Sequence, residues 1–203
     1  MESIEGHVVR SDQPLAIELA STIHVADGSV VDALSTTSQL RTWLAINDER
    51  LSRPRPLAAG QLLPDLRALR DALRRLFAAA IDHRRPLVAD IASVNKATGC
   101  APDHIELRWT SQHGPHGAHV GHADPGRAVL ARIAADGIEV LTGAYGPLTA
   151  CGGPSCVLFF VPAHPRQAWC SPGCGNRARV ARHYQRSRVD HGADRSGRRS
   201  RQR

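Results

Sequence analysis

Four cysteines near the C-terminal end limit the structures that are open to this chain. They are spaced Cys151-x4-Cys156-x13-Cys170-x3-Cys174, which gives two short pairs separated by a longer loop. A structural zinc site takes four soft ligands in a tetrahedron, and two such pairs can supply four thiolates from two turns. The spacing therefore predicts one structural Zn²⁺ per chain, with another soft metal or an iron–sulfur cluster as the alternative for the same ligands.

The residues around the cysteines predict how the site is assembled. The stretch VLFFVP at 157–162 is typical of a strand that forms one arm of a small hairpin. Ser171 followed by Pro172 is typical of the cap and first position of a helix, which places Cys174 in the first turn. Residues 148–186 contain few apolar residues, so metal binding would also supply folding energy, and reduced thiols without a metal are the weaker alternative.

Positive charge is concentrated behind the fourth cysteine. The formal net charge of the chain is +7, and from Gly175 to Arg203 there are ten Arg and two Asp, a net of +8. Such asymmetry is typical of a chain end that binds a polyanion. On the predicted helix, Ala178, Ala181 and Tyr184 are expected to face the zinc site, with arginines on the other side. With a solvated basic face as the alternative, the predicted nucleic-acid contacts are Asn176, Arg177, Arg179, Arg182 and Arg186.

Most of the chain before the cysteines is predicted to be helical. Leu40, Trp43 and Leu44 recur at helical spacing behind Ser and Thr cap candidates. The longest apolar stripe lies in residues 63–82, with Pro64 at a first-turn position where proline is tolerated. The predicted helices cover residues 14–25, 35–47, 63–82, 86–98 and 126–143.

A strand pair and a division into units complete the fold prediction. HIELRWTS at 104–111 alternates apolar and polar residues, which predicts a half-buried strand with GAHVGHA as its hairpin partner. For residues 14–25 a buried strand is the alternative to a helix. The predicted fold is mainly α with a small β-hairpin (α+β), in which a helical domain precedes a finger built from a knuckle, a hairpin and a helix. The predicted units are a helical domain at 1–146, a four-cysteine finger at 147–188 and a basic disordered tail at 189–203.

Four histidines form the other candidate cluster. His113, His116, His119 and His122 recur every three residues in a stretch rich in Gly and Pro, which favours a solvated turn over a second metal site. Cys100 is expected to be an ordinary residue near a helix end. The sequence has no Gly-x-Ser-x-Gly, phosphate-binding loop or deaminase signature, so we expect no enzyme activity. It also has no signal peptide and no apolar run long enough to span a bilayer, so we expect a cytoplasmic protein without membrane contact.

The cysteine-rich sequence resembles a known family. CGGPSC…WCSPGCGNRARVARHYQR is similar to the CGNR zinc finger, whose name matches Cys174-Gly175-Asn176-Arg177 and which has a Trp before its third cysteine, here Trp169. The stretches SQLRTWLA, ALRDALRRLFAAA and ARIAADGIEVLTG resemble the ABATE domain that commonly precedes this finger in stress-induced bacterial transcription regulators. The resemblance implies that the four cysteines bind zinc and that the protein binds DNA.

These observations lead to a functional hypothesis. The protein is expected to be a transcription regulator in which structural zinc fixes an arginine-rich helix that contacts DNA. The alternative is a zinc-stabilised module that binds a protein or RNA without sequence-specific DNA binding. A protein partner or a small-molecule signal at the N-terminal domain stays open, and the sequence predicts neither the oligomeric state nor the DNA target.

Overall fold

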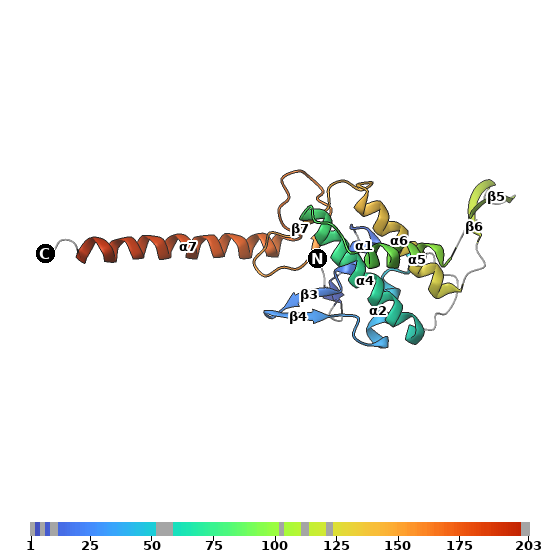
Figure 1. Cartoon of the computed structure of the whole chain (residues 1–203), viewed down its shortest axis with the longest axis horizontal. Helices are drawn as coiled ribbons and strands as arrows, with labels where there is room; N and C mark the ends of the chain where they lie inside the picture. The colour runs from blue at the N-terminus through green and yellow to red at the C-terminus, as the bar shows by residue number, and fades with distance from the viewer. Residues whose placement is uncertain are drawn as a thin grey trace.

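The computed structural model of the chain shows a helical body from which one long helix projects (Figure 1). The described backbone comprises residues 3–4, 7–8, 12–51, 59–101, 104–110, 114–120 and 124–199. Side chains are described for residues 12–51, 59–101 and 124–186.

The elements of the described residues form a mainly α fold with small antiparallel strand pairs, which confirms the predicted fold class. The helices are α1 (Leu15–Ala20), α2 (Thr37–Ile46), α3 (Asp48–Leu51), α4 (Ala59–Ile81), α5 (Val88–Gly99), α6 (Pro125–Leu141) and α7 (Pro172–Arg199). The strand pairs are β1 (Ser3–Ile4) with β2 (His7–Val8), β3 (Ile23–Ala26) with β4 (Ser29–Asp32), β5 (His104–Thr110) with β6 (Gly114–Val120), and β7 (Thr149–Ala150) with β8 (Phe159–Phe160).

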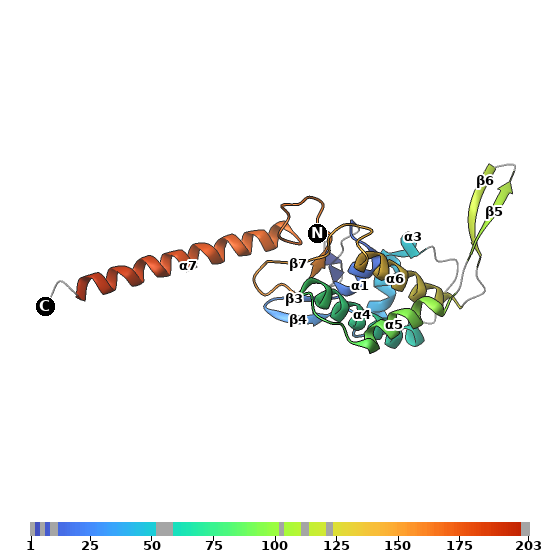
Figure 2. The ribbon, with the colours of Figure 1, turned by 45° about the horizontal axis from the view of Figure 1, so that its top comes forward.

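Helix α4 is the centre of the helical body. Helices α1, α2, α5 and α6 pack against it, and Figure 2 shows α1, α5 and α6 beside it. Burying one leucine or phenylalanine side chain contributes roughly 1.5–3 kcal/mol, so a continuous stripe along α4 supplies much of the stabilisation of the body. The buried residues of this stripe are Leu62, Leu66, Leu69, Leu73, Leu76 and Phe77.

Capping side chains fix where two of the helices begin. Thr36 Oγ1 accepts the backbone N–H of Gln39 at 3.2 Å, and Gln39 Oε1 accepts the backbone N–H of Thr36 at 2.9 Å. This capping box satisfies two N–H groups that a helix start leaves without a partner. Helix α6 is capped by Asp124, whose carboxylate accepts the N–H groups of Gly126 and Arg127 at 2.9 and 3.3 Å.

An ion pair between the buried Arg70 and the half-buried Asp32 ties the β3–β4 hairpin to α4. Arg70 is only 2% exposed, and its two terminal nitrogens lie 2.6 and 3.1 Å from the carboxylate oxygens of Asp32. Burial alone would raise the pKa of Asp32, but hydrogen bonds from Arg70 and from the Leu34 N–H outweigh it and lower that pKa. The fork geometry of the guanidinium therefore fixes the end of β4 on the helical body.

The prediction for residues 14–25 is wrong beyond the first helical turns. Helix α1 ends at Ala20, and β3 begins at Ile23. The turn to β4 is made by Asp27 and Gly28, both with positive φ (49° and 79°). Asp-Gly is the preferred dipeptide for a two-residue hairpin turn, and β-branched residues on both sides favour strands. The Asp-Gly dipeptide and its β-branched neighbours therefore indicated a hairpin in the sequence, which the prediction of a helix did not take into account.

The predicted start of the longest helix is also wrong. Helix α4 begins at Ala59, so Pro64 lies inside the helix and not in its first turn. Proline has no N–H to donate to the carbonyl of Gly60, four residues earlier. Both residues are exposed, so water can satisfy that carbonyl and the helix tolerates the proline.

The tail predicted to be disordered is helical as far as Arg199. Helix α7 continues through the boundary at residue 189 without a break. Once a helix is nucleated, each further residue adds a backbone hydrogen bond, which favours continuation although Gly192 and Gly197 are weak helix formers. The prediction of disorder was based on the lack of apolar residues, and a helix that projects from the body does not need them.

The segment between the two cysteine pairs packs on the N-terminal helices. Gln13 pairs with the backbone of Val161 through both ends of its amide, at 3.1 and 2.7 Å. Arg74 donates to the carbonyl of Val157 at 3.0 Å, and its guanidinium lies over the ring of Phe159. The rings of Phe77 and Phe159 meet edge to face, with centroids 5.7 Å apart. The finger is therefore held to the body by hydrogen bonds, ring contacts and a shared core.

Candidate metal centre and basic helix

The four predicted cysteines come together at the base of α7. Their sulfur atoms all lie within 4.8 Å of one another, and Cys170 Sγ is 3.8 Å from Cys156 Sγ and 3.5 Å from Cys174 Sγ. Cys151 directly follows β7, and Cys170 lies just before α7. Cys174 lies in the first turn of that helix, where Ser171 Oγ accepts its N–H at 3.3 Å. The expected cap at Ser171 is thus present and aims both C-terminal thiols at one point.

The sulfurs of Cys151 and Cys174 have hydrogen-bond donors beside them. Cys151 Sγ accepts the backbone N–H groups of Gly153 at 3.4 Å and Cys170 at 3.3 Å. Arg177 donates to Cys174 Sγ at 3.0 Å, which brings a positive charge to the cluster. Hydrogen bonds and a cation favour the charged form of a thiol. A cluster of four thiolates with such donors fits Zn²⁺, which prefers soft ligands in a closed site.

The thiols also influence one another's protonation. The thiols of Cys156 and Cys170 donate to Cys151, which lowers the pKa of Cys151. Donation to Cys151 raises the pKa of Cys156 to about 11 and also raises the pKa of Cys170. Thiols that share protons in this way must release them to coordinate a metal ion, so metal binding here is coupled to proton release.

Two glycines allow the chain to close around the cluster. A Cβ atom on Gly153 would lie 2.9 Å from Cys174 Cβ and 3.3 Å from its sulfur. A Cβ on Gly175 would lie 3.1 Å from the ring of Trp169. The distance at Gly153 is shorter than packed Cβ atoms adopt, so this position requires glycine, whereas at Gly175 the Trp169 ring would have to shift slightly. The sequence analysis did not identify Gly153 as a residue of the metal centre. Its position two residues after the predicted ligand Cys151 could have indicated that role.

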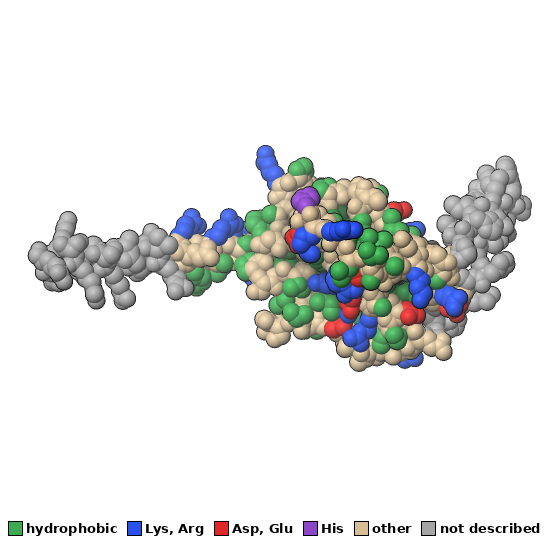
Figure 3. Space-filling model, in the orientation of Figure 1, with side chains coloured by type: hydrophobic (Ala, Val, Ile, Leu, Met, Phe, Trp, Pro, Cys, Tyr) green, Lys and Arg blue, Asp and Glu red, His purple; other side chains and the backbone are tan. Residues whose placement is uncertain are grey.

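The five predicted nucleic-acid contacts fall into two groups. Arg177 is bonded to Cys174 Sγ, and the guanidinium of Arg182 lies 5.9 Å from the ring centroid of Trp169. Asn176, Arg179 and Arg186 are exposed, and no hydrogen bond or ion pair engages them within the described part of the chain. Figure 3 shows blue arginine side chains on the described first half of α7. All five side chains are thus exposed, and Arg177 and Arg182 additionally contact Cys174 and Trp169 of the finger.

The expected inner face of α7 needs one correction. Ala178 is buried and Ala181 is half-buried, as the sequence predicted. Tyr184 is 66% exposed, because the helix has left the finger one turn earlier. Val180, on the same side of the helix, is 47% exposed. The prediction that Tyr184 faces the zinc site is therefore wrong.

The other predicted candidates are placed only in part. His113 and His122 lie outside the described residues, and for His116 and His119 only the backbone of β6 is described. Cys100 Sγ donates to the carbonyl of Ala97 at 2.9 Å at the end of α5, in accord with an ordinary helix-end residue. No described helix is both long and apolar enough to cross a membrane.

The fold and the cysteine cluster together define a zinc-finger protein with a helical N-terminal domain. The CGNR zinc finger family matches residues 148–187, directly over the cluster. The ABATE family, described as "Putative stress-induced transcription regulator", matches residues 13–144. The chain belongs to the ABATE family, and its finger is of the CGNR type. Among curated proteins no sequence matches the chain.

These matches confirm two expectations from the sequence. The resemblance to an ABATE domain followed by a CGNR finger is confirmed in that order along the chain. One structural zinc ion is confirmed as the expected cofactor by the finger family together with the close set of four sulfurs. Neither family is an enzyme family.

Proposed function

We propose that this protein is a cytoplasmic transcription regulator that binds DNA through the exposed face of α7. In this proposal Cys151, Cys156, Cys170 and Cys174 are the zinc ligands, and the metal fixes the first turn of the helix. The observation that carries the proposal is the pair Arg179 and Arg186, which is exposed and unpaired within the described residues on a helix that projects from the body (Figure 1). Guanidinium groups on a rigid helix suit phosphate contacts and base-edge readout.

The dimensions of α7 support this role. Its 28 residues give a length of about 42 Å at 1.5 Å per residue. An α-helix fits into the major groove of B-DNA, which is about 12 Å wide. Figure 2 shows that α7 extends away from helices α1 to α6.

The contacts made inside the finger narrow the set of DNA-contacting residues. We assign the main contacts to Asn176, Arg179 and Arg186, whose side chains are exposed. Arg177 serves chiefly to support Cys174, and Arg182 to cover Trp169, although the outer atoms of both guanidinium groups can still meet phosphates. Loss of the exposed pair should therefore weaken DNA binding without releasing zinc.

The test is the double variant Arg179→Ala and Arg186→Ala. Each lost phosphate contact should reduce the dependence of log K on log salt by about one unit, so a fall of about two in slope is expected. The matched control is Arg41→Ala with Arg127→Ala, which removes the same charge from exposed positions on the N-terminal helices. If both double variants weaken binding equally, net charge and not this face of α7 is responsible.

A second function is favoured by one observation. Val180 and Tyr184 lie one turn apart on α7 and are 47% and 66% exposed. Such an apolar pair on a free helix suits a protein partner, and an exposed tyrosine can stack on an unpaired RNA base. Competition among duplex DNA, single-stranded RNA and heparin separates these functions, because a DNA regulator must prefer duplex DNA over other polyanions.

A further inference from the structure

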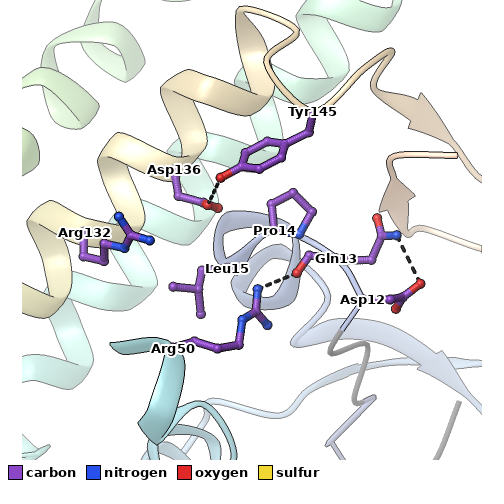
Figure 4. Close-up of a pocket in the computed structure, with 8 residues that line it drawn as sticks. All are labelled: Asp12, Gln13, Pro14, Leu15, Arg50, Arg132, Asp136 and Tyr145. Atoms are coloured by element: carbon purple, nitrogen blue, oxygen red, sulfur yellow. Dashed lines mark hydrogen bonds between the residues drawn. The ribbon is translucent and has the colours of Figure 1, made fainter. Parts of the chain in front are cut away.

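A pocket lies in the N-terminal domain close to the place where the finger attaches. Its volume is about 350 Å³, within the range of about 300–1,000 Å³ that is usual for small-molecule sites. Figure 4 shows its walls, which come from the start of α1, the end of α3, helix α6 and the turn after α6. The lining residues are Asp12, Gln13, Pro14, Leu15, Arg50, Arg132, Asp136 and Tyr145.

Two arginines bring positive charge to this pocket. Arg132 is exposed and has no hydrogen bond or ion pair with a described residue. Arg50 donates to the carbonyl of Gln13 and to Asn47 Oδ1, which are both neutral groups. Neither guanidinium is therefore neutralised by a carboxylate within the described residues.

The carboxylate beside them is already engaged. Asp136 is 5% exposed, and one of its oxygens accepts the backbone N–H of Ala16 at 2.8 Å. Its other oxygen lies 2.9 Å from the hydroxyl of Tyr145. Asp12 is exposed, and its carboxylate is turned toward the amide of Gln13 at 3.4 Å (Figure 4). Both carboxylates are thus hydrogen-bonded to neutral groups, and neither forms an ion pair with Arg50 or Arg132.

We propose that this pocket binds a small organic carboxylate. The guanidinium groups of Arg50 and Arg132 bind the carboxylate group, since arginine presents planar donors that match its two oxygens. The apolar part of the ligand packs on Leu15, Pro14 and the ring of Tyr145, which line the same pocket. A few charged groups that orient an otherwise apolar molecule are typical of ligand sites.

The pocket is connected to the finger through one side chain. Gln13 lines the pocket, and its amide makes both hydrogen bonds to the backbone of Val161. A ligand that contacts Gln13 therefore contacts the residue that holds the segment between the cysteine pairs. Binding in the pocket should be detectable at Val161 without any change at the zinc site.

The experiment is an NMR titration of the full-length zinc-loaded protein with benzoate, acetate and inorganic phosphate. Benzamide serves as an uncharged analogue of benzoate. We expect benzoate to bind best and to shift the signals of the Gln13 side-chain amide and the Val161 N–H, while benzamide does not bind. The variant Arg132→Gln should weaken benzoate binding at least tenfold and leave the thermal midpoint of the free protein unchanged, because Arg132 is exposed.

The matched control is Arg127→Gln, which removes an exposed arginine from the same helix outside the pocket. It should bind benzoate as the unmodified protein does. The proposal is overturned if no probe binds, if benzamide binds as well as benzoate, or if Arg132→Gln and Arg127→Gln have equal effects. Preferential binding of phosphate would show an inorganic anion site and would likewise overturn the proposal of an organic carboxylate.

Discussion

At the scale of single residues, Gly153 tests how tightly the chain closes around the metal centre. A Cβ at this position would lie 2.9 Å from Cys174 Cβ and within 3.4 Å of two sulfurs. Gly153→Ala should therefore displace Cys174 and lower zinc affinity about tenfold, or ~1.4 kcal/mol, which falls within the usual cost of overpacking. Competition with a chromogenic chelator measures this.

The control for Gly153→Ala is Gly173→Ala in the first turn of α7. A Cβ there would lie 3.8 Å from Ser171 Oγ, which is an ordinary contact. Its zinc affinity should match that of the unmodified protein. Equal zinc affinity in both variants would show that the cluster has more room than its geometry indicates.

Arg177 gives a second test at the residue scale. Its guanidinium donates to Cys174 Sγ at 3.0 Å, and groups that hydrogen-bond a metal ligand typically change metal affinity by about 10–100-fold when removed. Because Arg177 is exposed, we expect Arg177→Ala to release zinc about tenfold faster to a chelator. Arg179→Ala should leave zinc release unchanged, since Arg179 does not reach a sulfur. An unchanged release rate for Arg177→Ala would show that Arg177 does not stabilise the zinc site. Its guanidinium would then be available for DNA contacts.

The zinc site shows what a sequence can and cannot predict about single residues. The cysteines were predictable because the ligand type and the spacing both lie in the local sequence. The contact of Arg177 with Cys174 depends on the phase of the helix and on a side-chain rotamer. Gly175 depends on where Trp169 packs. Local residue types do not specify such contacts, so the partners of Arg177 and Gly175 became visible only in the structure.

At the scale of elements, the contact between α4 and α6 depends on Gly137. A Cβ there would lie 2.5 Å from Leu73 Cδ2, and Leu73 is fully buried. Alanine favours a helix over glycine by about 0.5–1 kcal/mol, but overpacking costs about 1–3 kcal/mol. Gly137→Ala should therefore lower the free energy of unfolding by about 1 kcal/mol in urea denaturation.

The control for Gly137→Ala is Gly60→Ala in the first turn of α4. No described atom lies within 4 Å of a Cβ at this position. That variant should raise the free energy of unfolding by about 0.5 kcal/mol, because it only restricts the unfolded chain. If Gly137→Ala is also stabilising, the two helices can separate slightly and glycine is not required between them.

The elements differ in how well the sequence predicted them. Helix α2 was predictable because Thr36 and Gln39 form a local capping box. The β3–β4 hairpin was missed although Asp27 and Gly28 form its turn, because an apolar segment of this length fits either a helix or a strand. The start of α4 was misplaced because Pro64 was treated as a helix-start signal. Local signals thus identify elements well when caps and turns are weighed together with apolar periodicity.

At the scale of the whole molecule, the finger is not an independent appendage. Val161 belongs to the core of the helical body, and Arg74 connects the carbonyl of Ala20 to that of Val157, at 2.6 and 3.0 Å. These contacts join positions far apart in the sequence, so no local pattern predicts them. The predicted boundary at residue 146 lies between the two family matches. It does not lie between two separate cores, because Val161 of the finger belongs to the core of the helical body.

The positive charge of the chain is concentrated on one projecting element. The net charge of +8 from Gly175 onward is carried on α7 and the residues that follow it. Nonspecific attraction to a polyanion should come from the whole basic segment, whereas selective recognition should come from its first half, which zinc fixes to the body. Removing residues 190–203 separates these two contributions.

The most direct measurement combines zinc content with salt-dependent binding to random and genomic DNA fragments. It compares the full-length protein with a variant that lacks residues 190–203. We predict one zinc ion per chain in both proteins and a weaker, less salt-dependent affinity after the deletion, with the preference for particular fragments retained. If the preference is absent, or if binding is lost with residues 190–203, the zinc-fixed half of α7 does not read DNA and the central claim is wrong.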